Sequence, residues 1–213
     1  MRKLICAAGI VLLISSCNNN TEKSGEPVPG TDSLMVDTPA VTRQVFNKDS
    51  LLNATGRDIL SILKSKKYDS LVKYFSSSDS VHFSPYGFIG SGEQTLSAKD
   101  FTTVLSGNKK LNWGSYDGSG DSINLTAKQY IEKFVYNADF LNAEKIAVDS
   151  FVKTGNSLNN LKKSYPGSRF IEYHFSGFDK KYAGMDWTSL RLVFKEFNDR
   201  YYLIAIVHDQ WTV

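Results

Sequence analysis

The chain has 213 residues, of which 25 are Lys or Arg, 22 are Asp or Glu and 41% are hydrophobic, and this is the balance of an ordinary globular protein. The net charge of +3 is too small to indicate a nucleic-acid or anionic-membrane partner. Its two cysteines are too few for a disulfide-rich scaffold. The composition therefore excludes these classes and predicts one globular core.

The beginning of the chain has the pattern of an export signal. Arg2 and Lys3 precede an apolar stretch at residues 4–14, which is too short to span a bilayer because a spanning helix needs about 20 residues. The following Ile14-Ser15-Ser16-Cys17 resembles the bacterial lipobox, whose cysteine is lipidated and becomes the new N-terminus. We therefore expect a signal peptide at residues 1–16 and a lipid on Cys17. The alternative is a buried apolar helix with an incidental cysteine.

Residues 17–45 have the composition of a flexible tether. They are rich in Asn, Ser, Thr, Glu and Pro and contain no aromatic residue, so they cannot bury a core. We expect a protein of the cell envelope that is held to the membrane through the lipid on Cys17. In a Gram-negative host, Asn18 favours the outer membrane, because inner-membrane lipoproteins often have Asp there. The tether also lacks the acidic run of some surface-exported lipoproteins, which favours a domain that faces the periplasm.

The folded part is expected at residues 46–213, because every Trp, Tyr and Phe lies in that range. Hydrophobic spacing predicts a helix over residues 52–63, capped by Asp49 or Ser50, and a shorter helix near 68–75. A strand follows near 81–86. The middle is predicted to be largely helical, with helices at 98–105, 127–136 and 157–164, a cap at Thr126 and a turn-rich loop at 113–121.

The last third predicts three long strands at 169–175, 189–197 and 201–211, because it is rich in β-branched and aromatic residues. Asn198 and Asp199 suit a two-residue hairpin loop. With that loop, one face of the hairpin is apolar and packs on the helices, and it consists of Leu190, Leu192, Phe194, Leu203, Ala205 and Val207. Arg191 and His208 then share the other face, whereas a three-residue loop would exchange these partners.

The predicted fold class is α+β, with N-terminal helices packed on a curved antiparallel sheet, three C-terminal strands and a helical middle. This order, together with the segment Lys66-Lys67-Tyr68-Asp69-Ser70-Leu71-Val72-Lys73-Tyr74-Phe75, resembles the cystatin-like fold of the nuclear-transport-factor-2-like (SnoaL-like) superfamily. The resemblance implies a sheet that wraps around helices to form a cone. His82-Phe83-Ser84-Pro85-Tyr86-Gly87 and Gly184-Met185-Asp186-Trp187 also look like a family of exported bacterial lipoproteins of uncharacterised function, so this second resemblance implies no activity.

Familiar catalytic and metal motifs are missing from the sequence. Cys6 leaves with the signal and Cys17 carries lipid, which excludes thiol chemistry. His82, His174 and His208 have no second ligand at short spacing, and isolated histidines on strands are usually packing residues. We therefore expect no metal and no cofactor. The calcium-like and serine-elbow-like segments lack required residues, since Ser122, Lys128 and Asn159 stand at those positions.

The remaining chemical candidates come from strand alternation. Glu172 and His174 lie two apart on one strand and share a face, and Arg191 and His208 join them if the hairpin loop is right. His208 and the adjacent Asp209 point to opposite faces and cannot form a dyad. The candidate ligand-binding residues at the open end of the sheet are Glu172, His174, Arg191 and His208, with Trp187 or Trp211 on the rim. The alternative is a solvated outer face with ordinary charges, and tryptophans that only pack.

Two classes of function remain open. The preferred one is a noncatalytic, lipid-anchored domain that binds an envelope protein or a small ligand. The alternative is a hydrolase or isomerase that uses a His–carboxylate pair in a pocket, and no catalytic residue is assigned. A binding domain needs an accessible cavity or apolar patch, whereas the enzyme needs His174 or His208 within hydrogen-bond reach of a carboxylate beside a concavity.

Overall fold

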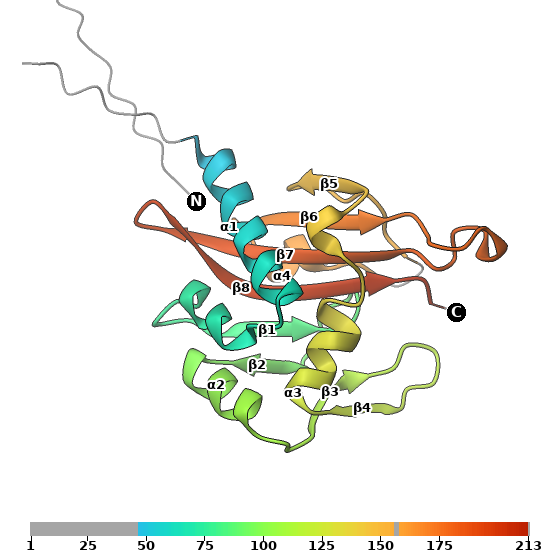
Figure 1. The fold of residues 1–213 in the computed structure, drawn as a ribbon, viewed down its shortest axis with the longest axis horizontal. Helices are drawn as coiled ribbons and strands as arrows, with labels where there is room; N and C mark the ends of the chain where they lie inside the picture. Colours follow the sequence, from blue (N-terminus) through green and yellow to red (C-terminus); the bar gives the residue numbers. More distant parts are fainter. Residues whose placement is uncertain (1–46, 156–157, 213) are drawn as a thin grey trace, which may run out of the picture. The chain divides into compact units, whose positions relative to one another are not determined.

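The computed structural model describes residues 47–155 and 158–212, and it places the helices and strands between Lys48 and Gln210 (Figure 1). The expected signal peptide at 1–16, the lipidated Cys17 and the tether at 17–45 lie outside the described residues. Within the described ranges, the helices are all too short or too polar to cross a membrane.

Two helices come first. Helix α1, Lys48–Lys64, begins at Asn47, whose side-chain oxygen accepts hydrogen bonds from the backbone N–H groups of Asp49 and Ser50. The cap is therefore Asn47, two residues before the predicted Asp49, because Asn47 has an extended backbone and a side-chain acceptor for the N–H groups of the first turn, whereas Asp49 and Ser50 already belong to the helix. The short 3₁₀ helix η1, Tyr68–Tyr74, follows. Both helices bury apolar side chains in the main core, namely Leu52, Ile59, Leu60, Leu63, Tyr68 and Leu71.

The sheet has six strands in the order β2-β1-β8-β7-β6-β5. Their bounds are Val81–Ser84 (β1), Gln94–Leu96 (β2), Lys145–Val148 (β5), Arg169–Phe175 (β6), Thr188–Phe197 (β7) and Arg200–Gln210 (β8). The predicted α+β class is confirmed. The prediction of a wholly antiparallel sheet is wrong, because β1 lies parallel to β8. A long connection rather than a hairpin joins these two strands, so nothing in the chain forces them to be antiparallel.

The middle contains more strand than the sequence predicts. Besides β2 and β5, the strands β3, Leu111–Ser115, and β4, Ser122–Leu125, form a separate two-stranded sheet. The expected helices are present as α2, Ala98–Ser106, and as α3, Ala127–Tyr130, which continues into the π-helical turn η2, Ile131–Val135, and Thr126 caps α3 as expected. Two shorter turns are η3, Phe140–Asn142, and η4, Lys180–Tyr182. The predicted 157–164 helix is reduced to α4, Leu161–Ser164.

The β7–β8 hairpin has the predicted two-residue loop, since Phe197 pairs with Arg200 and both Asn198 and Asp199 have positive φ. The register then shifts between Val193 and Phe194, because Ile204 is an extra residue on β8. A one-residue bulge moves every later side chain of that strand to the opposite face.

The bulge corrects the predicted faces. Leu190 lies opposite His208, and Arg191 lies opposite Val207. His208 therefore shares the face of the leucines, whereas Ala205 and Val207 share the face of Arg191.

The sheet has an apolar core on each side. Its helix face packs on α1, η1 and η2 and includes Phe83, Ile171, Tyr173, Leu190, Leu192, Phe194, Leu203 and Ile206. Its outer face carries a smaller cluster of Phe170, Val193, Ala205 and Val207, which Leu161 of α4 joins together with Phe151 and Tyr165. The described residues of the connection from β5 to β6, 149–155 and 158–168, therefore cover part of the outer face.

Candidate functional site

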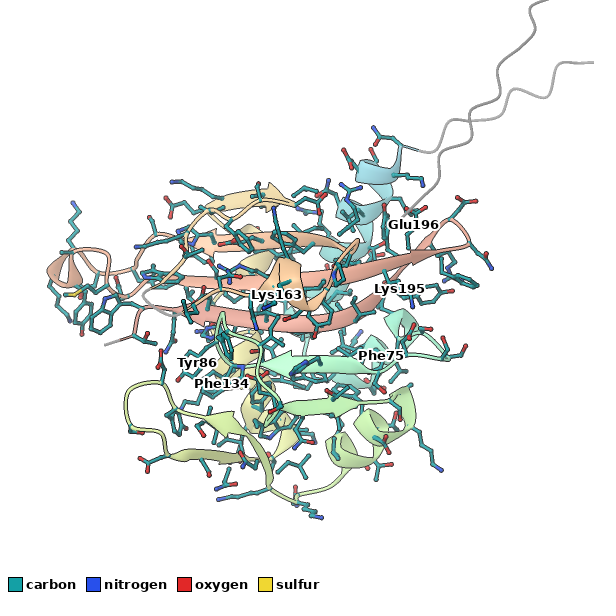
Figure 2. The ribbon with its side chains drawn as sticks, turned by 180° about the vertical axis from the view of Figure 1, so that it is seen from behind. Phe75, Tyr86, Phe134, Lys163, Lys195 and Glu196 are labelled. Carbon is teal, nitrogen blue, oxygen red and sulfur yellow. The ribbon has the colours of Figure 1, made fainter. Side chains whose placement is uncertain are left out.

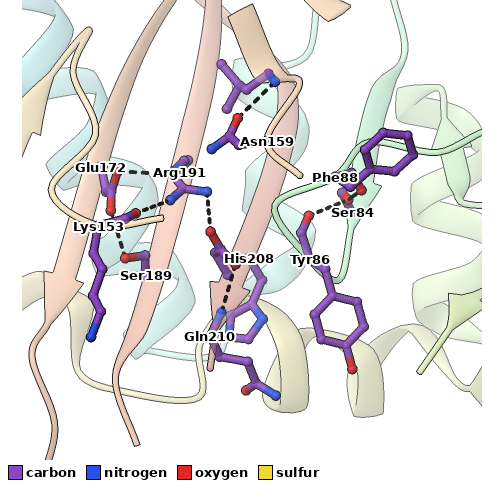
Figure 3. Close-up of polar contacts among 12 residues, drawn as sticks. Ser84, Tyr86, Phe88, Lys153, Asn159, Glu172, Ser189, Arg191, His208 and Gln210 are labelled. Carbon is purple, nitrogen blue, oxygen red and sulfur yellow. Dashed lines mark hydrogen bonds and ion pairs between the residues drawn. The ribbon is translucent and has the colours of Figure 1, made fainter. Parts of the chain in front are cut away.

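Three of the predicted site residues, Glu172, His174 and Arg191, lie on the outer face, but they are buried, and Figure 3 shows Arg191 beside Glu172 and Lys153. Arg191 is 0% exposed and lies between two carboxylates. Its Nε donates to Oε2 of Glu172 at 3.0 Å and its Nη1 donates to Oδ2 of Asp209 at 2.9 Å. Its Nη2 donates to the backbone oxygen of Lys153 at 2.8 Å. Arg191 thus holds the 149–155 segment against the sheet.

Further hydrogen bonds hold this buried charge network, which consists of Arg191, Glu172, Asp209, Ser189 and His174. The Ser189 hydroxyl donates to Oε1 of Glu172 at 2.8 Å, so Nδ1 of His174, 2.8 Å from that hydroxyl, is the donor in its contact. The backbone N–H of Val152 donates to Oε2 of Glu172. Burial lowers the pKa of His174, and burial raises the pKa of Asp209 against the opposing effect of Arg191. Glu172 and His174 share a face, as alternation predicts, and their environment is a packed interior.

His208 lies on the opposite side of the sheet, which is a correction to the predicted site. Its Nδ1 donates to the backbone oxygen of Pro85 at 2.9 Å, and its Nε2 lies 3.0 Å from Oγ1 of Thr188 and 3.2 Å from Nδ2 of Asn137. Burial lowers the pKa of His208 to about 4, and the charge of Arg191 acts in the same direction. This histidine is therefore neutral at pH 7 and is a hydrogen-bonded core residue.

The two tryptophans predicted on the rim lie in different environments. Trp187 is buried beside the His174 ring, with Nζ of Lys153 5.1 Å from its ring centre. Trp211 is 38% exposed near the end of the chain. The surface depressions described below are lined by none of these predicted site residues.

A different histidine has the geometry of a functional residue. Nε2 of His82 lies 2.7 Å from Oε2 of Glu93, and Nδ1 of His82 lies 3.0 Å from the hydroxyl of Tyr165. The side chains of His82 and Glu93 are 15% and 9% exposed. Because a carboxylate accepts and a tyrosine hydroxyl can donate, a neutral His82 donates from Nε2 and accepts at Nδ1. The Tyr165 hydroxyl, the His82 imidazole and the Glu93 carboxylate are thus connected by consecutive hydrogen bonds.

The sequence gives no short-range signal for this chain of contacts. Eleven residues separate His82 from Glu93, and 83 separate it from Tyr165. Glu93 is brought beside His82 only because β2 folds back on β1, pairing His82 with Thr95. Tyr165 arrives with the segment that covers the outer face. Strand β2 has three residues and was not predicted, so this site could not be assembled from sequence patterns.

An aromatic groove opens on the Glu93 side of the Tyr165–His82–Glu93 contacts. Its volume is about 430 Å³, and its lining consists of Tyr86, Phe88, Glu93, Ser115, Tyr116, Asp117 and Leu158. Phe88 is 46% exposed and Leu158 78%. Figure 2 shows Tyr86 beside Phe134, whose ring centre is 6.0 Å away, so the core supports this wall of the groove.

One buried hydroxyl lies close to the charged wall of the groove. Tyr130 is stacked on Trp113 at 4.0 Å, and its hydroxyl oxygen makes no hydrogen bond with described residues. Burial raises the pKa of Tyr130 well above its usual value, and the negative charge of Glu93 acts in the same direction. An unpartnered hydroxyl in a packed core is costly unless something binds it.

A second, more polar depression opens on the His82 side. It has a volume of about 370 Å³ and is lined by Asp79, Ser80, His82, Thr95, Tyr165, Lys195 and Ile204. Lys195 is engaged with Asp79, whose Oδ2 lies 3.3 Å from its Nζ. The His82–Glu93 pair thus lies between the aromatic groove and this polar depression.

In the described part of the chain, no group of three or more His, Cys, Asp or Glu residues could hold a metal ion. Comparison of the chain with protein-family models, with curated proteins and with solved structures found no match.

Proposed function

We propose that this chain is a lipid-anchored protein of the cell envelope whose domain binds a small ligand in the aromatic groove without catalysing a reaction. The observation that carries the proposal is the groove itself. Its volume of about 430 Å³ lies in the range of small-molecule sites, about 300–1,000 Å³, and it combines aromatic walls with a few polar groups.

The lining indicates the class of ligand. Glu93 and Asp117 contribute carboxylates, which accept hydrogen bonds and attract positive charge. Tyr86 and Phe88 offer aromatic surface that suits an apolar body or a cation, whereas the Tyr116 ring already has Nζ of Lys133 4.6 Å from its centre and suits an apolar body. The basic residue Lys133 lies near this lining, and its Nζ already donates a hydrogen bond to the hydroxyl of Tyr116 at 2.7 Å. We therefore expect a ligand with an apolar body and an ammonium or another hydrogen-bond donor.

The histidines support a noncatalytic role. Both ring nitrogens of His82 and both of His208 lie within hydrogen-bond distance of protein groups. His174 is 2% exposed inside the buried charge network. A general base needs a nitrogen that can reach a substrate, and the burial of His208, 0% exposed, and of His174 argues against that role for both.

Calorimetric titration with 2-phenylethylamine tests the binding function, because this probe has one aromatic ring and one ammonium. We expect a dissociation constant of about 1 mM, the scale for so few atoms. Phenylacetate has a similar size and a carboxylate instead, and we expect it to bind much more weakly. Equal binding of the two compounds, or heat from neither, would contradict the proposed ligand class.

Membrane fractionation tests the anchor, which rests on the sequence Ile14-Ser15-Ser16-Cys17. Cys17→Ala should block maturation and leave a precursor about 2 kDa heavier, since about sixteen residues of signal remain attached. Wild-type protein that is fully soluble, with an unmodified thiol at Cys17, would refute the anchor.

The His82 chain of contacts favours a second candidate, a hydrolase or isomerase. Tyr165, His82 and Glu93 provide a hydroxyl, an imidazole and a carboxylate in the order used by nucleophilic triads. Against this role, burial raises the pKa of Tyr165 to about 12, with the charge of Glu93 adding to the shift, so transfer of its proton to His82 is disfavoured.

Hydrolysis of p-nitrophenyl acetate separates the two functions. An enzyme should lose its activity in His82→Gln, which keeps a polar side chain but cannot act as a base. The noncatalytic proposal expects the same slow rate from wild type and variant.

A further inference from the structure

The loop between β6 and β7, residues 176–187, exposes three large apolar side chains close together in sequence. Phe178 is 62% exposed, Tyr182 46% and Met185 47%. Lys180 and Lys181 lie between them and are also exposed. Such side chains are individually common on surfaces, but a cluster of them with lysines is typical of an interaction site.

The loop is built to hold this shape. Oδ2 of Asp186 accepts hydrogen bonds from the backbone N–H groups of Phe178 and Asp179, both at 2.8 Å, which ties the two ends of the loop together. Gly177 has a φ of 145°, and a Cβ there would lie 2.6 Å from Oδ1 of Asp186. Asp179 also accepts from the N–H of Lys181 at 3.0 Å. The exposed side chains are therefore presented by an ordered turn.

The loop projects beyond the sheet, as the orange segment at the right of Figure 1. It joins β6 to the beginning of β7 at Thr188, whereas Lys48 at the start of α1 pairs with Glu196 at the other end of β7. The apolar tip is thus at the opposite end of the sheet from the point where the described chain begins.

We propose that this loop inserts into the interface of a lipid bilayer. Aromatic rings and a methionine can enter the boundary between headgroups and acyl chains, while the Tyr182 hydroxyl and the lysine ammonium groups remain at headgroup level. The projecting shape leaves the loop free to meet a broad surface. The loop is neutral overall, with Lys180 and Lys181 against Asp179 and Asp186. Lys181 bonds to Asp179 at 2.9 Å and Asp186 accepts from two backbone N–H groups of the turn, so the exposed Lys180 supplies the positive charge that complements anionic headgroups.

This inference rests on the proposed function in one respect, namely that a lipid on Cys17 keeps the domain near a membrane. The loop adds a second, weak membrane contact to the lipid anchor. The loop would then fix how the domain lies relative to a bilayer.

Vesicle co-sedimentation tests the loop independently of the lipid. The protein is the mature chain, residues 17–213, with Cys17→Ser, and the vesicles are phosphatidylcholine with and without phosphatidylglycerol. We expect weak binding that increases with phosphatidylglycerol and falls about tenfold or more in the combined variant Phe178→Ser, Tyr182→Ser and Met185→Ser. Phe197→Ser is the matched control, because Phe197 is 61% exposed at the other end of β7.

Wild type that stays in the supernatant with both kinds of vesicle would overturn the inference, as would an equal loss in the Phe197→Ser control. Lys180→Glu provides a variant that leaves the apolar side chains in place, and it should remove the phosphatidylglycerol dependence. An unchanged dependence would overturn the assigned role of Lys180. None of these results depends on the lipid at Cys17 or on the groove, which are tested by fractionation and by titration.

Discussion

At the scale of single residues, Arg191 is the charge on which the outer face depends. It is 0% exposed and is bonded to Glu172, to Asp209 and to the backbone of Lys153. Sequence alternation correctly places Arg191 on the face opposite the helices. If that face were solvated, replacing Arg191 would cost little stability. Described residues of the β5–β6 connection cover Arg191 and reverse this expectation. A buried ion pair that loses one partner leaves the other charge unpaired.

Arg191→Ala should therefore lower the free energy of unfolding by about 3–5 kcal/mol. Urea unfolding of the variant and of wild type measures the difference. Lys195→Ala is the control on the same strand, because the Lys195 side chain is 57% exposed and its ion pair contributes about 0–1 kcal/mol. Equally small effects of the two substitutions would show that the outer face is solvated after all.

His208 should make stability depend on pH. The pKa of His208 is about 4 in the folded protein against an ordinary value of 6.5, so between these values the unfolded chain binds the extra proton. The contribution of His208 is thus fully present above about pH 6.5 and is lost as the pH falls toward about 4. Between about pH 7 and about pH 5 the loss is about 2 kcal/mol.

Comparing how the unfolding free energies of wild type and His208→Asn change with pH isolates the contribution of His208. His174 also has a lowered pKa and acts in the same direction, whereas the raised pKa of Asp209 acts in the opposite one. Both residues remain in His208→Asn, so their contributions cancel when the two proteins are compared. The variant should be less stable at neutral pH but should lose about 2 kcal/mol less on acidification. Parallel pH profiles from urea unfolding would contradict a neutral, buried His208.

At the scale of elements, the contact of α1 with the sheet depends on a glycine. A Cβ at Gly56 would lie 2.3 Å from the hydroxyl oxygen of Tyr173 and 2.8 Å from Cδ1 of Ile171. Gly56→Ala should therefore destabilise the domain by about 1–3 kcal/mol, although alanine favours a helix more than glycine does.

Tyr173→Phe tests the cause of that loss. The Tyr173 hydroxyl is buried without a hydrogen-bond partner among the described residues, so its removal alone should be nearly neutral. In the Gly56→Ala background the same substitution should recover part of the lost stability, because the closest atom is gone. Additive effects in this double-mutant cycle would mean that the helix does not approach the sheet as closely as described.

Elements differ in how well the sequence predicts them, and length explains much of the difference. Helix α1 and strands β6, β7 and β8 were predicted because each is long enough to show its period clearly. Strands β2 to β5 have three to five residues, which is too few for an alternation to be visible. The bulge at Ile204 has no sequence signature, yet it alone moves His208 to the helix face.

At the scale of the whole molecule, the candidate site follows from contacts between distant segments. Alternation correctly groups Glu172 with His174, because that grouping needs only one strand. The His82–Glu93 pair and the aromatic groove need the unpredicted β1–β2 pairing and the β3–β4 sheet, so no local pattern reveals them. The polar residues that sequence patterns single out, such as Glu172 and Arg191, are buried and stabilise the fold. The groove is lined by residues that no sequence pattern singles out.

Backbone amide shifts during titration with 2-phenylethylamine test most directly whether this domain binds a small ligand in the aromatic groove. We expect the largest changes around Tyr86, Glu93 and Tyr116, and we expect Phe88→Ser to reduce them while Phe197→Ser leaves them unchanged. Changes centred on the polar depression around Lys195, or spread evenly over the surface, would contradict the assignment of the groove as the binding site.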